Sequence, residues 1–235
     1  MISSVVNSAS YTSPNQVAPC SWVSIFGQSL ANAQVLASSV PLGGNLGGSR
    51  AVLAGTPLPL NFVADGQINA QIPCGLSTDT QLDLQVVNGN TQSPTQPIVV
   101  SDAQPALFTV NQQGFGQGAI FGVAADGSEF VADSSHPVHA GDVVVIYATG
   151  LGPVSPAVPE GQPAPSSPPA LTTQTPQVTI GGLPAMVQFS GLTPTAVGLY
   201  QINVVVPANL PAGSVPVVVT QGTQSSQPGV TMAVH

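Results

Sequence analysis

Positive charge is almost absent from this sequence of 235 residues, because lysine and arginine together contribute a single residue, Arg50. A protein that binds a nucleic-acid backbone neutralises several phosphates with cationic side chains, so a nucleic-acid partner is excluded. Electrostatic attraction to an anionic membrane surface is excluded for the same reason. The formal net charge of −8 favours solubility but indicates no particular partner.

Charged residues of both signs make up only 4% of the chain, whereas 43% is hydrophobic. Disordered chains usually combine low hydrophobicity with high net charge, so we expect a folded protein with an uncharged polar surface. Such a surface is typical of extracellular and cell-surface proteins. The first seven residues lack the basic start and apolar stretch of a signal peptide, so a secretion signal is not expected within this chain. No apolar run approaches the ~18 residues of a transmembrane helix, and no membrane insertion is expected.

The motifs of common enzyme classes are missing as well. The sequence contains no nucleophile elbow, phosphate-binding loop, dinucleotide-binding glycine motif, zinc-protease motif or EF-hand loop. With one arginine and three histidines, most acid–base and phosphoryl-transfer reactions lack the side chains they need. We therefore predict a protein that is not an enzyme, with no catalytic residues and no cofactor.

Two groups of potential metal ligands need an interpretation. Carboxylates and imidazoles bind zinc, and four of them recur at intervals of three residues: Asp133, His136, His139 and Asp142. Pro137 and Gly141 argue against the helix that would align them, so we interpret them as a solvated connector. Asp126, Glu129 and Asp133 could offer oxygen ligands to calcium, but their spacing matches no known calcium loop. No metal-binding residue is predicted.

Short strands dominate what is present. Twenty-five glycines and twenty-four prolines separate runs rich in valine, isoleucine, threonine and aromatic residues, namely 22–26, 82–87, 142–147, 177–180, 201–206 and 216–220. Such runs, separated by turn residues, are typical of an all-β sandwich or barrel. The dipeptides at 88–89, 126–127 and 181–182 predict hairpin turns. The strand aromatics Trp22, Phe26, Tyr147 and Tyr200 are expected in the core.

An internal repeat organises these strands. The segment QINAQIP at 67–73 recurs as QINVVVP at 201–207, and 23–30 (VSIFGQSL) matches 144–151 (VVIYATGL). Because the segments keep their order, we predict two copies of one module of about 100 residues. The first domain is expected at 1–106 and the second at 107–235. The second would carry an extra hairpin and a Pro-rich loop at 153–176, which we expect to be an extended, exposed spacer; a ligand-binding loop is the alternative.

Several motifs of the two copies resemble a known family. In the second copy they are 141–154 (GDVVVIYATGLGPV), 161–165 (GQPAP), 179–185 (TIGGLPA) and 198–207 (GLYQINVVVP). In the first copy they are 6–11 (VNSASY), 24–27 (SIFG) and 46–48 (LGG). They resemble an uncharacterised C-terminal module abundant in Solibacter and other Acidobacteria, and its companion form. The resemblance implies two tandem immunoglobulin-like β-sandwich domains of the IPT/TIG type in a secreted or surface protein, and it brings no catalytic residues.

Cys20 and Cys74 are widely spaced, which permits either one disulfide in an oxidising compartment or two buried thiols. The second copy has Gly141 and Ala208 at the matching positions. Both cysteines thus occur in one copy and neither in the other. This paired occurrence favours a structural disulfide between the ends of two neighbouring strands.

The amides of the repeated motif are Gln67, Asn69, Gln201 and Asn203. They alternate with apolar residues and therefore share one face of a strand. Buried amides need hydrogen-bond partners, so we interpret these four residues as a structural motif.

Together these features predict a non-enzymatic extracellular structural or adhesive module. Self-assembly into a fibre or surface layer is one form of that role, since the strand edges lack the lysines that block edge-to-edge pairing. The expected partners are further copies or other surface proteins. The alternative is a carbohydrate-binding module of a secreted protein with a glycan partner, which would need an aromatic residue exposed on a flat face or a loop tip.

Overall fold

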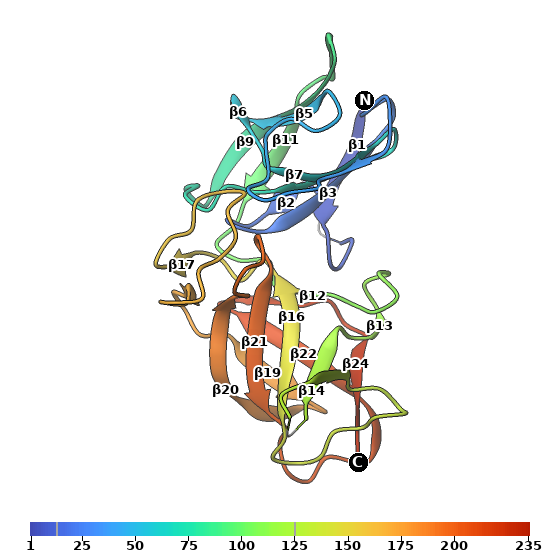
Figure 1. Ribbon diagram of the computed structural model, residues 1–235, viewed down its shortest axis with the longest axis vertical. Coiled ribbons are helices and arrows are strands. Elements are labelled where there is room, and N and C mark those ends of the chain that lie inside the picture. The colour runs from blue at the N-terminus through green and yellow to red at the C-terminus, as the bar shows by residue number, and fades with distance from the viewer. Residues whose placement is uncertain (13, 125) are drawn as a thin grey trace.

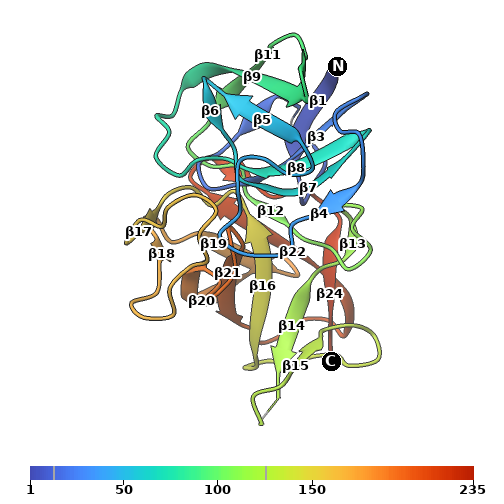
Figure 2. The same cartoon turned by 45° about the horizontal axis from the view of Figure 1, so that its top comes forward.

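The computed structural model describes residues 1–12, 14–124 and 126–235 (Figure 1). Over these residues the chain is all β, with twenty-four strands and no helix. The described residues accordingly contain no helix that could cross a membrane. The all-β fold class predicted from the short apolar runs is confirmed. Figures 1 and 2 show the N-terminal sheets stacked end to end on the C-terminal sheet.

The N-terminal half (residues 1–102) forms two sheets that share one core. The first has the order β1 (Ile2–Asn7), β3 (Trp22–Gly27), β8 (Gln67–Gln71), β7 (Leu60–Ala64) and β4 (Val35–Leu36). The second has the order β2 (Gln16–Val17), β11 (Gln96–Val100), β9 (Thr80–Asn88), β5 (Ser49–Leu53) and β6 (Thr56–Pro57), with β10 (Thr91–Gln92) beside β9. Ile25 and Ile68 of the first sheet and Leu84 and Ile98 of the second lie in one buried cluster. The two sheets therefore pack face to face, because the apolar side chains that alternate along each strand must be covered on one side of each sheet.

The C-terminal half (residues 106–235) forms a single connected sheet of thirteen strands. Its main path runs through β13 (Gly116–Gln117), β24 (Val230–Val234), β22 (Gly213–Gln221), β19 (Gln177–Ile180), β20 (Leu183–Leu192), β21 (Tyr200–Val205), β16 (Val143–Thr149), β14 (Ile120–Val123) and β15 (Glu129–Val131). The strands off this path are β12 (Ala106–Leu107), β17 (Val154–Ser155), β18 (Leu171–Thr172) and β23 (Gln224–Ser225). Side chains from β16, β21, β22 and β24 meet in a second buried cluster.

Hairpins form at the three positions where the sequence predicted turns, although the first turn is Gly89–Asn90, one residue later than the predicted dipeptide at 88–89. Gly181 and Gly182, with φ of 59° and 82°, form a two-residue turn between β19 and β20. Both positions need positive φ, which glycine adopts at little cost. Gly89, with φ of 58°, starts the turn from β9 to β10, and β14 and β15 pair around the turn that contains Gly127.

The repeated segments form the same local structures. β7 and β8 shift register between Leu60 and Phe62, and β20 and β21 shift between Val187 and Phe189. In each half the phenylalanine after the bulge lies opposite the asparagine of the repeated motif. A bulge bends its strand and increases the local twist, so each copy turns its sheet at the same point.

A second shared structure is found at the last hairpin of each copy. The hydroxyl oxygen of Ser93 accepts a hydrogen bond from the Val86 backbone N–H at 3.0 Å. Ser226 accepts from Val219 in the same way, also at 3.0 Å. In each half, therefore, a serine seven residues after the valine holds the same backbone position.

The Pro-rich loop at 153–176 differs from its prediction as an extended, exposed spacer. It contains the short paired strands β17 and β18, and Val158, Ala164 and Ala170 are buried in the core cluster of the C-terminal half. Proline prevents long ladders, but the apolar residues between the prolines still gain free energy by leaving water. The loop is therefore packed against the sheet.

Candidate functional site

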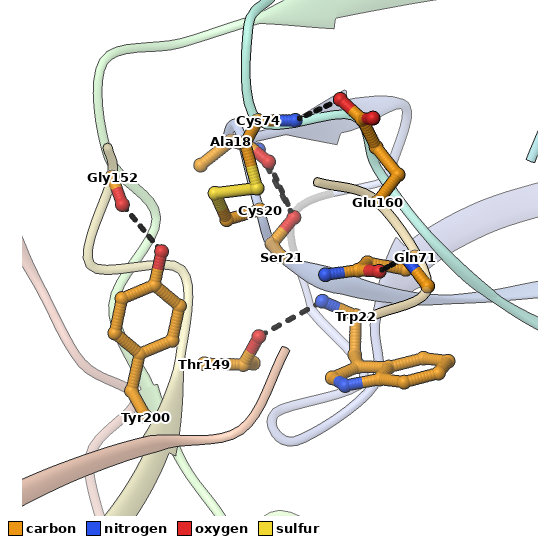
Figure 3. The surroundings of a disulfide bond; sticks show 11 residues. Ala18, Cys20, Ser21, Trp22, Gln71, Cys74, Thr149, Gly152, Glu160 and Tyr200 are labelled. Atoms are coloured by element: carbon orange, nitrogen blue, oxygen red, sulfur yellow. Dashed lines mark hydrogen bonds between the residues drawn. A yellow bond between two sulfur atoms is a disulfide. The ribbon is translucent and has the colours of Figure 1, made fainter. Parts of the chain in front are cut away.

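The junction between the halves is built around the disulfide between Cys20 and Cys74 (Figure 3). This bond links the ends of β3 and β8, whose last paired residues are Trp22 and Gln71. The predicted disulfide is confirmed. Cys20 is completely buried, and it packs in the core cluster of the C-terminal half, although it belongs to the chain of the N-terminal half. The disulfide is therefore part of the contact between the halves.

Trp22 lies at the same junction and corrects the prediction that it is a core aromatic. Its backbone N–H donates to the Thr149 hydroxyl oxygen at 2.9 Å, and its indole Nε1–H donates to the Val197 carbonyl oxygen at 3.0 Å. Both partners belong to the C-terminal half, so the indole ring is held between the two halves. Tyr200, by contrast, is fully buried, as predicted; Phe26 and Tyr147 are half-buried.

The Pro-rich loop provides further contacts between the halves. The buried Gln71 side-chain oxygen accepts from the Gly161 N–H at 2.7 Å, and the Gly161 carbonyl accepts from the Leu42 N–H at 2.8 Å. The Cys74 N–H donates to the Glu160 carboxylate at 3.2 Å. A segment expected to be a spacer is thus hydrogen-bonded to the N-terminal half.

Close approach at the junction depends on glycine. A Cβ added to Gly198, whose φ is +60°, would lie 2.8 Å from the Gln71 amide nitrogen and 2.9 Å from the Trp22 indole nitrogen. A Cβ added to Gly150, whose φ is +79°, would fall on the carbonyl oxygen of Gln104. A larger residue at Gly198 would push the halves apart, and one at Gly150 would displace Gln104 in the segment that connects them. Either substitution would also strain its own backbone.

Beside the Trp22 contacts, a cleft of 630 Å³ opens between the halves. The N-terminal half contributes residues from β3, β7 and β8 and from two loops, and the C-terminal half contributes residues from 108–112 and 195–199. Every side chain that lines this cleft is uncharged. They include the aromatic residues Trp22, Tyr11 and Phe108 and the amides Asn61, Asn69 and Gln112. We call it the junction cleft.

The repeated amides form the same pair in each copy. The Gln67 amide nitrogen donates to the Asn69 side-chain oxygen at 2.8 Å, and Gln201 donates to Asn203 at the same distance. In the first copy Ser24 also donates to the Asn69 oxygen, at 3.1 Å. The first copy therefore has a larger polar network, and it is the copy whose asparagine lines the junction cleft.

The potential metal ligands of the sequence are arranged as separate pairs. His136 lies 3.5 Å from Asp133 and His139 lies 3.7 Å from Asp142, each pair within one exposed turn. The Ser135 N–H bonds the carboxylate of Asp133 and lowers its pKa. No group of three or more potential ligands occurs among the described residues.

The three acids considered for calcium also bond to different neighbours. Asp126 accepts from Ser128 at 2.6 Å, and this hydroxyl lowers the pKa of Asp126. Glu129 accepts from the Tyr147 hydroxyl at 3.4 Å. Each carboxylate thus has a local structural role in its turn or hairpin.

Of the residues that line the junction cleft, only Asn69 was predicted as a site residue from the sequence, and there in a structural role. A signal is nevertheless present in the repeat, because the two copies differ there. By the offset that aligns β3 with β16, Trp22 corresponds to Val143, and Ser24 corresponds to Val145. An aromatic ring and a hydroxyl in one copy, where the other has valine, mark this strand as specialised.

No family model matches the chain, and no curated protein matches it. Among solved structures, SGBP-B from a mixed-linkage glucan utilization locus of Bacteroides ovatus, in complex with a mixed-linkage heptasaccharide, is 13% identical with a TM-score of 0.36; the match covers 94% of this chain and 44% of that one. SGBP-B from a xyloglucan utilization locus of Bacteroides uniformis is 11% identical, with a TM-score of 0.30 and coverage of 97% and 48%. Domains 5–6 of the S-layer protein SbsC are 10% identical, with a TM-score of 0.29 and coverage of 100% and 96%. The chain spans less than half the length of the first two structures, and scores this low carry no functional assignment.

Proposed function

We propose that this chain is a non-enzymatic extracellular module with a structural or adhesive role. In this proposal the N-terminal and C-terminal halves are two tandem immunoglobulin-like β-sandwich domains, divided near residue 106, of the type that the Acidobacteria resemblance implies. The disulfide supports an oxidising location, because such bonds persist mainly outside the cytosol. The module acts as one stiff unit on a cell surface or in a surface layer.

The observation that carries this proposal is the extent of bonding at the junction. Trp22 provides two hydrogen bonds to the C-terminal half, and the Pro-rich loop provides three to the N-terminal half. Cys20 adds a completely buried apolar contact. Domains joined only by a linker move freely by default, whereas these bonds favour one fixed angle. A fixed angle suits a spacer that holds other domains at a set position.

Small-angle X-ray scattering with mass photometry over a concentration series tests this role. We expect the scattering curve to match one rigid arrangement of the two halves. A curve that only a broad set of inter-half distances can fit would contradict the stiff-module proposal. Regular oligomers at higher concentration would support assembly through unprotected strand edges, whereas a strict monomer would exclude assembly and leave the spacer role.

Gly150→Ala is expected to disturb the junction more than the folds of the separate halves. The new methyl group would collide with the Gln104 carbonyl, so we expect a loss of about 1–3 kcal/mol in the free energy of unfolding and an increase in the radius of gyration. Gly222→Ala is the matched control, because Gly222 also has positive φ, 60°, but a Cβ there meets nothing within 4 Å. Equal effects of the two substitutions in unfolding and scattering would show that the contact at Gly150 does not hold the junction.

A second candidate function, carbohydrate binding, is favoured by the junction cleft. Its aromatic and amide lining is typical of a site that binds an uncharged ligand, and Tyr11 is 37% exposed. A binding screen against immobilised glycans tests this candidate, and the absence of binding to every glycan would rule it out.

A further inference from the structure

We propose that the junction cleft is the binding site for a neutral oligosaccharide, with Trp22 and Tyr11 as stacking surfaces and the Asn69 amide as a hydrogen-bond donor. This inference rests on carbohydrate binding, the second function proposed above, and gives it a site. It does not depend on the structural role of the module. Three observations carry it: the charge of the lining, the orientation of Asn69 and the fixation of Trp22.

The lining of the junction cleft selects against charged ligands. Its side chains include hydroxyls, amides, aromatic rings and aliphatic groups, and none carries a charge. The one cationic side chain of the sequence, Arg50, is not part of this lining. A phosphate or carboxylate placed there would lose water without gaining a counter-charge, which is unfavourable. The cleft therefore suits a ligand that is polar through hydroxyl groups.

The side chain of Asn69 is held in one orientation. Its Oδ1 accepts hydrogen bonds from both Ser24 and the Gln67 amide nitrogen, so the oxygen is used by the protein. The amide group of asparagine also offers two N–H donors, and its nitrogen has no partner among the described residues. Because Asn69 lines the cleft, these donors are available to a sugar hydroxyl.

The ring of Trp22 is fixed before any ligand arrives. Its indole N–H is bonded to the Val197 carbonyl, and Gly198 lies against the same nitrogen. Trp22 lines the cleft, and a ring that is already ordered costs little conformational entropy on binding. Proline-rich peptides also bind aromatic grooves, so an oligoproline peptide is one of the comparison probes in the test.

Tyr11 adds a second aromatic surface at the rim of the cleft. Its φ is +56°, and its ring centroid lies 6.4 Å from that of Phe26. The cleft volume of 630 Å³ lies within the range of about 300–1,000 Å³ found for small-molecule sites. A cleft of this volume has room for a short oligosaccharide.

The test uses the intrinsic fluorescence of Trp22, which is the single tryptophan of the sequence and therefore reports directly on the cleft. The purified chain is titrated with neutral oligosaccharides built from glucose, mannose, xylose or N-acetylglucosamine. An oligogalacturonate of similar length and an oligoproline peptide are the comparison probes. We expect a saturable change with at least one neutral probe, and at least about 10-fold weaker binding of the acidic probe.

Two pairs of variants locate the binding. Tyr11→Ala should weaken it about 10-fold, whereas Phe115→Ala should leave it unchanged, since Phe115 is 60% exposed and lies outside the cleft. Asn69→Leu should weaken binding by a similar factor, whereas Asn203→Leu removes the equivalent amide of the other copy and should not. A cooperative thermal unfolding transition, measured for each of the four variants, is the control that the variant is folded.

The inference is overturned if no neutral oligosaccharide gives a saturable signal, or if Tyr11→Ala and Asn69→Leu bind as tightly as the original chain. Binding of the oligoproline peptide alone would overturn the ligand class. If glycans bind in the screen but the cleft variants have no effect, carbohydrate binding stands and this site is wrong. The structural role is judged separately, by scattering.

Discussion

Replacement of both cysteines, Cys20→Ala with Cys74→Ala, is expected to lower the free energy of unfolding by about 4 kcal/mol. The disulfide joins residues 54 positions apart, and opening a loop of this length increases the conformational entropy of the unfolded chain. The contact of Cys20 with the core of the C-terminal half should add to the loss. Urea unfolding of the oxidised chain and the variant measures the difference.

Unfolding of the unsubstituted chain in a reducing buffer is the control for this substitution. Because reduction opens the same loop without removing side-chain atoms, it should reproduce most of the loss. The scattering curve of the double variant should also indicate wider inter-half distances. A loss below about 1 kcal/mol would contradict the role assigned to the disulfide.

Tyr200→Ala is expected to lower the free energy of unfolding of the chain by about 3–5 kcal/mol. Tyr200 is the largest of the completely buried side chains, and its loss would leave a cavity in the C-terminal core. Its hydroxyl donates to the Gly152 carbonyl (Figure 3). Tyr200→Phe keeps the ring but removes this bond, so it should cost about 1–3 kcal/mol. Equal losses from the two variants, measured by urea unfolding, would show that packing of the ring contributes nothing beyond the hydroxyl.

The pH dependence of stability gives a second measure of Tyr200. Burial raises the pKa of its hydroxyl above the ordinary value, which is about 10. Above that pH the unfolded chain releases the proton while the folded chain keeps it. Tyr200 should therefore contribute no pH dependence of stability below about pH 10, and above it a fall of about 1.4 kcal/mol per pH unit. In Tyr200→Phe this part of the slope should disappear; the part due to Tyr147, whose pKa is also raised by burial, should remain.

Much of this architecture could be predicted because strands and turns leave local patterns. The glycine-containing dipeptides at 88–89, 126–127 and 181–182 marked the hairpins, and the repeated QIN segment located corresponding strands, β8 and β21. The disulfide followed from comparing the two copies with each other. These signals depend on residues near one another in sequence or on a duplicated pattern, so one sequence is sufficient to detect them.

The junction could not be predicted in the same way. Trp22 occupies a strand position that a core aromatic would also occupy, and its partners Thr149 and Val197 lie more than a hundred residues away. The alternation of apolar residues shows which face is covered but not which part of the chain covers it. The prediction of an exposed Pro-rich loop was wrong for a related reason. A high proline content is typical of exposed segments, and the sequence alone does not show that the few apolar residues between the prolines are buried against the sheet.

The parallel pairing of end strands has a mechanical consequence. β2 pairs in parallel with β11, and β13 pairs in parallel with β24, so in each half a strand near the beginning lies alongside the last one. The two ends of the chain lie at opposite ends of the molecule (Figures 1 and 2). A pull between these ends loads both pairs in shear, so their hydrogen bonds must break together instead of opening one after another. Tension along the long axis is therefore the direction in which this protein should yield last.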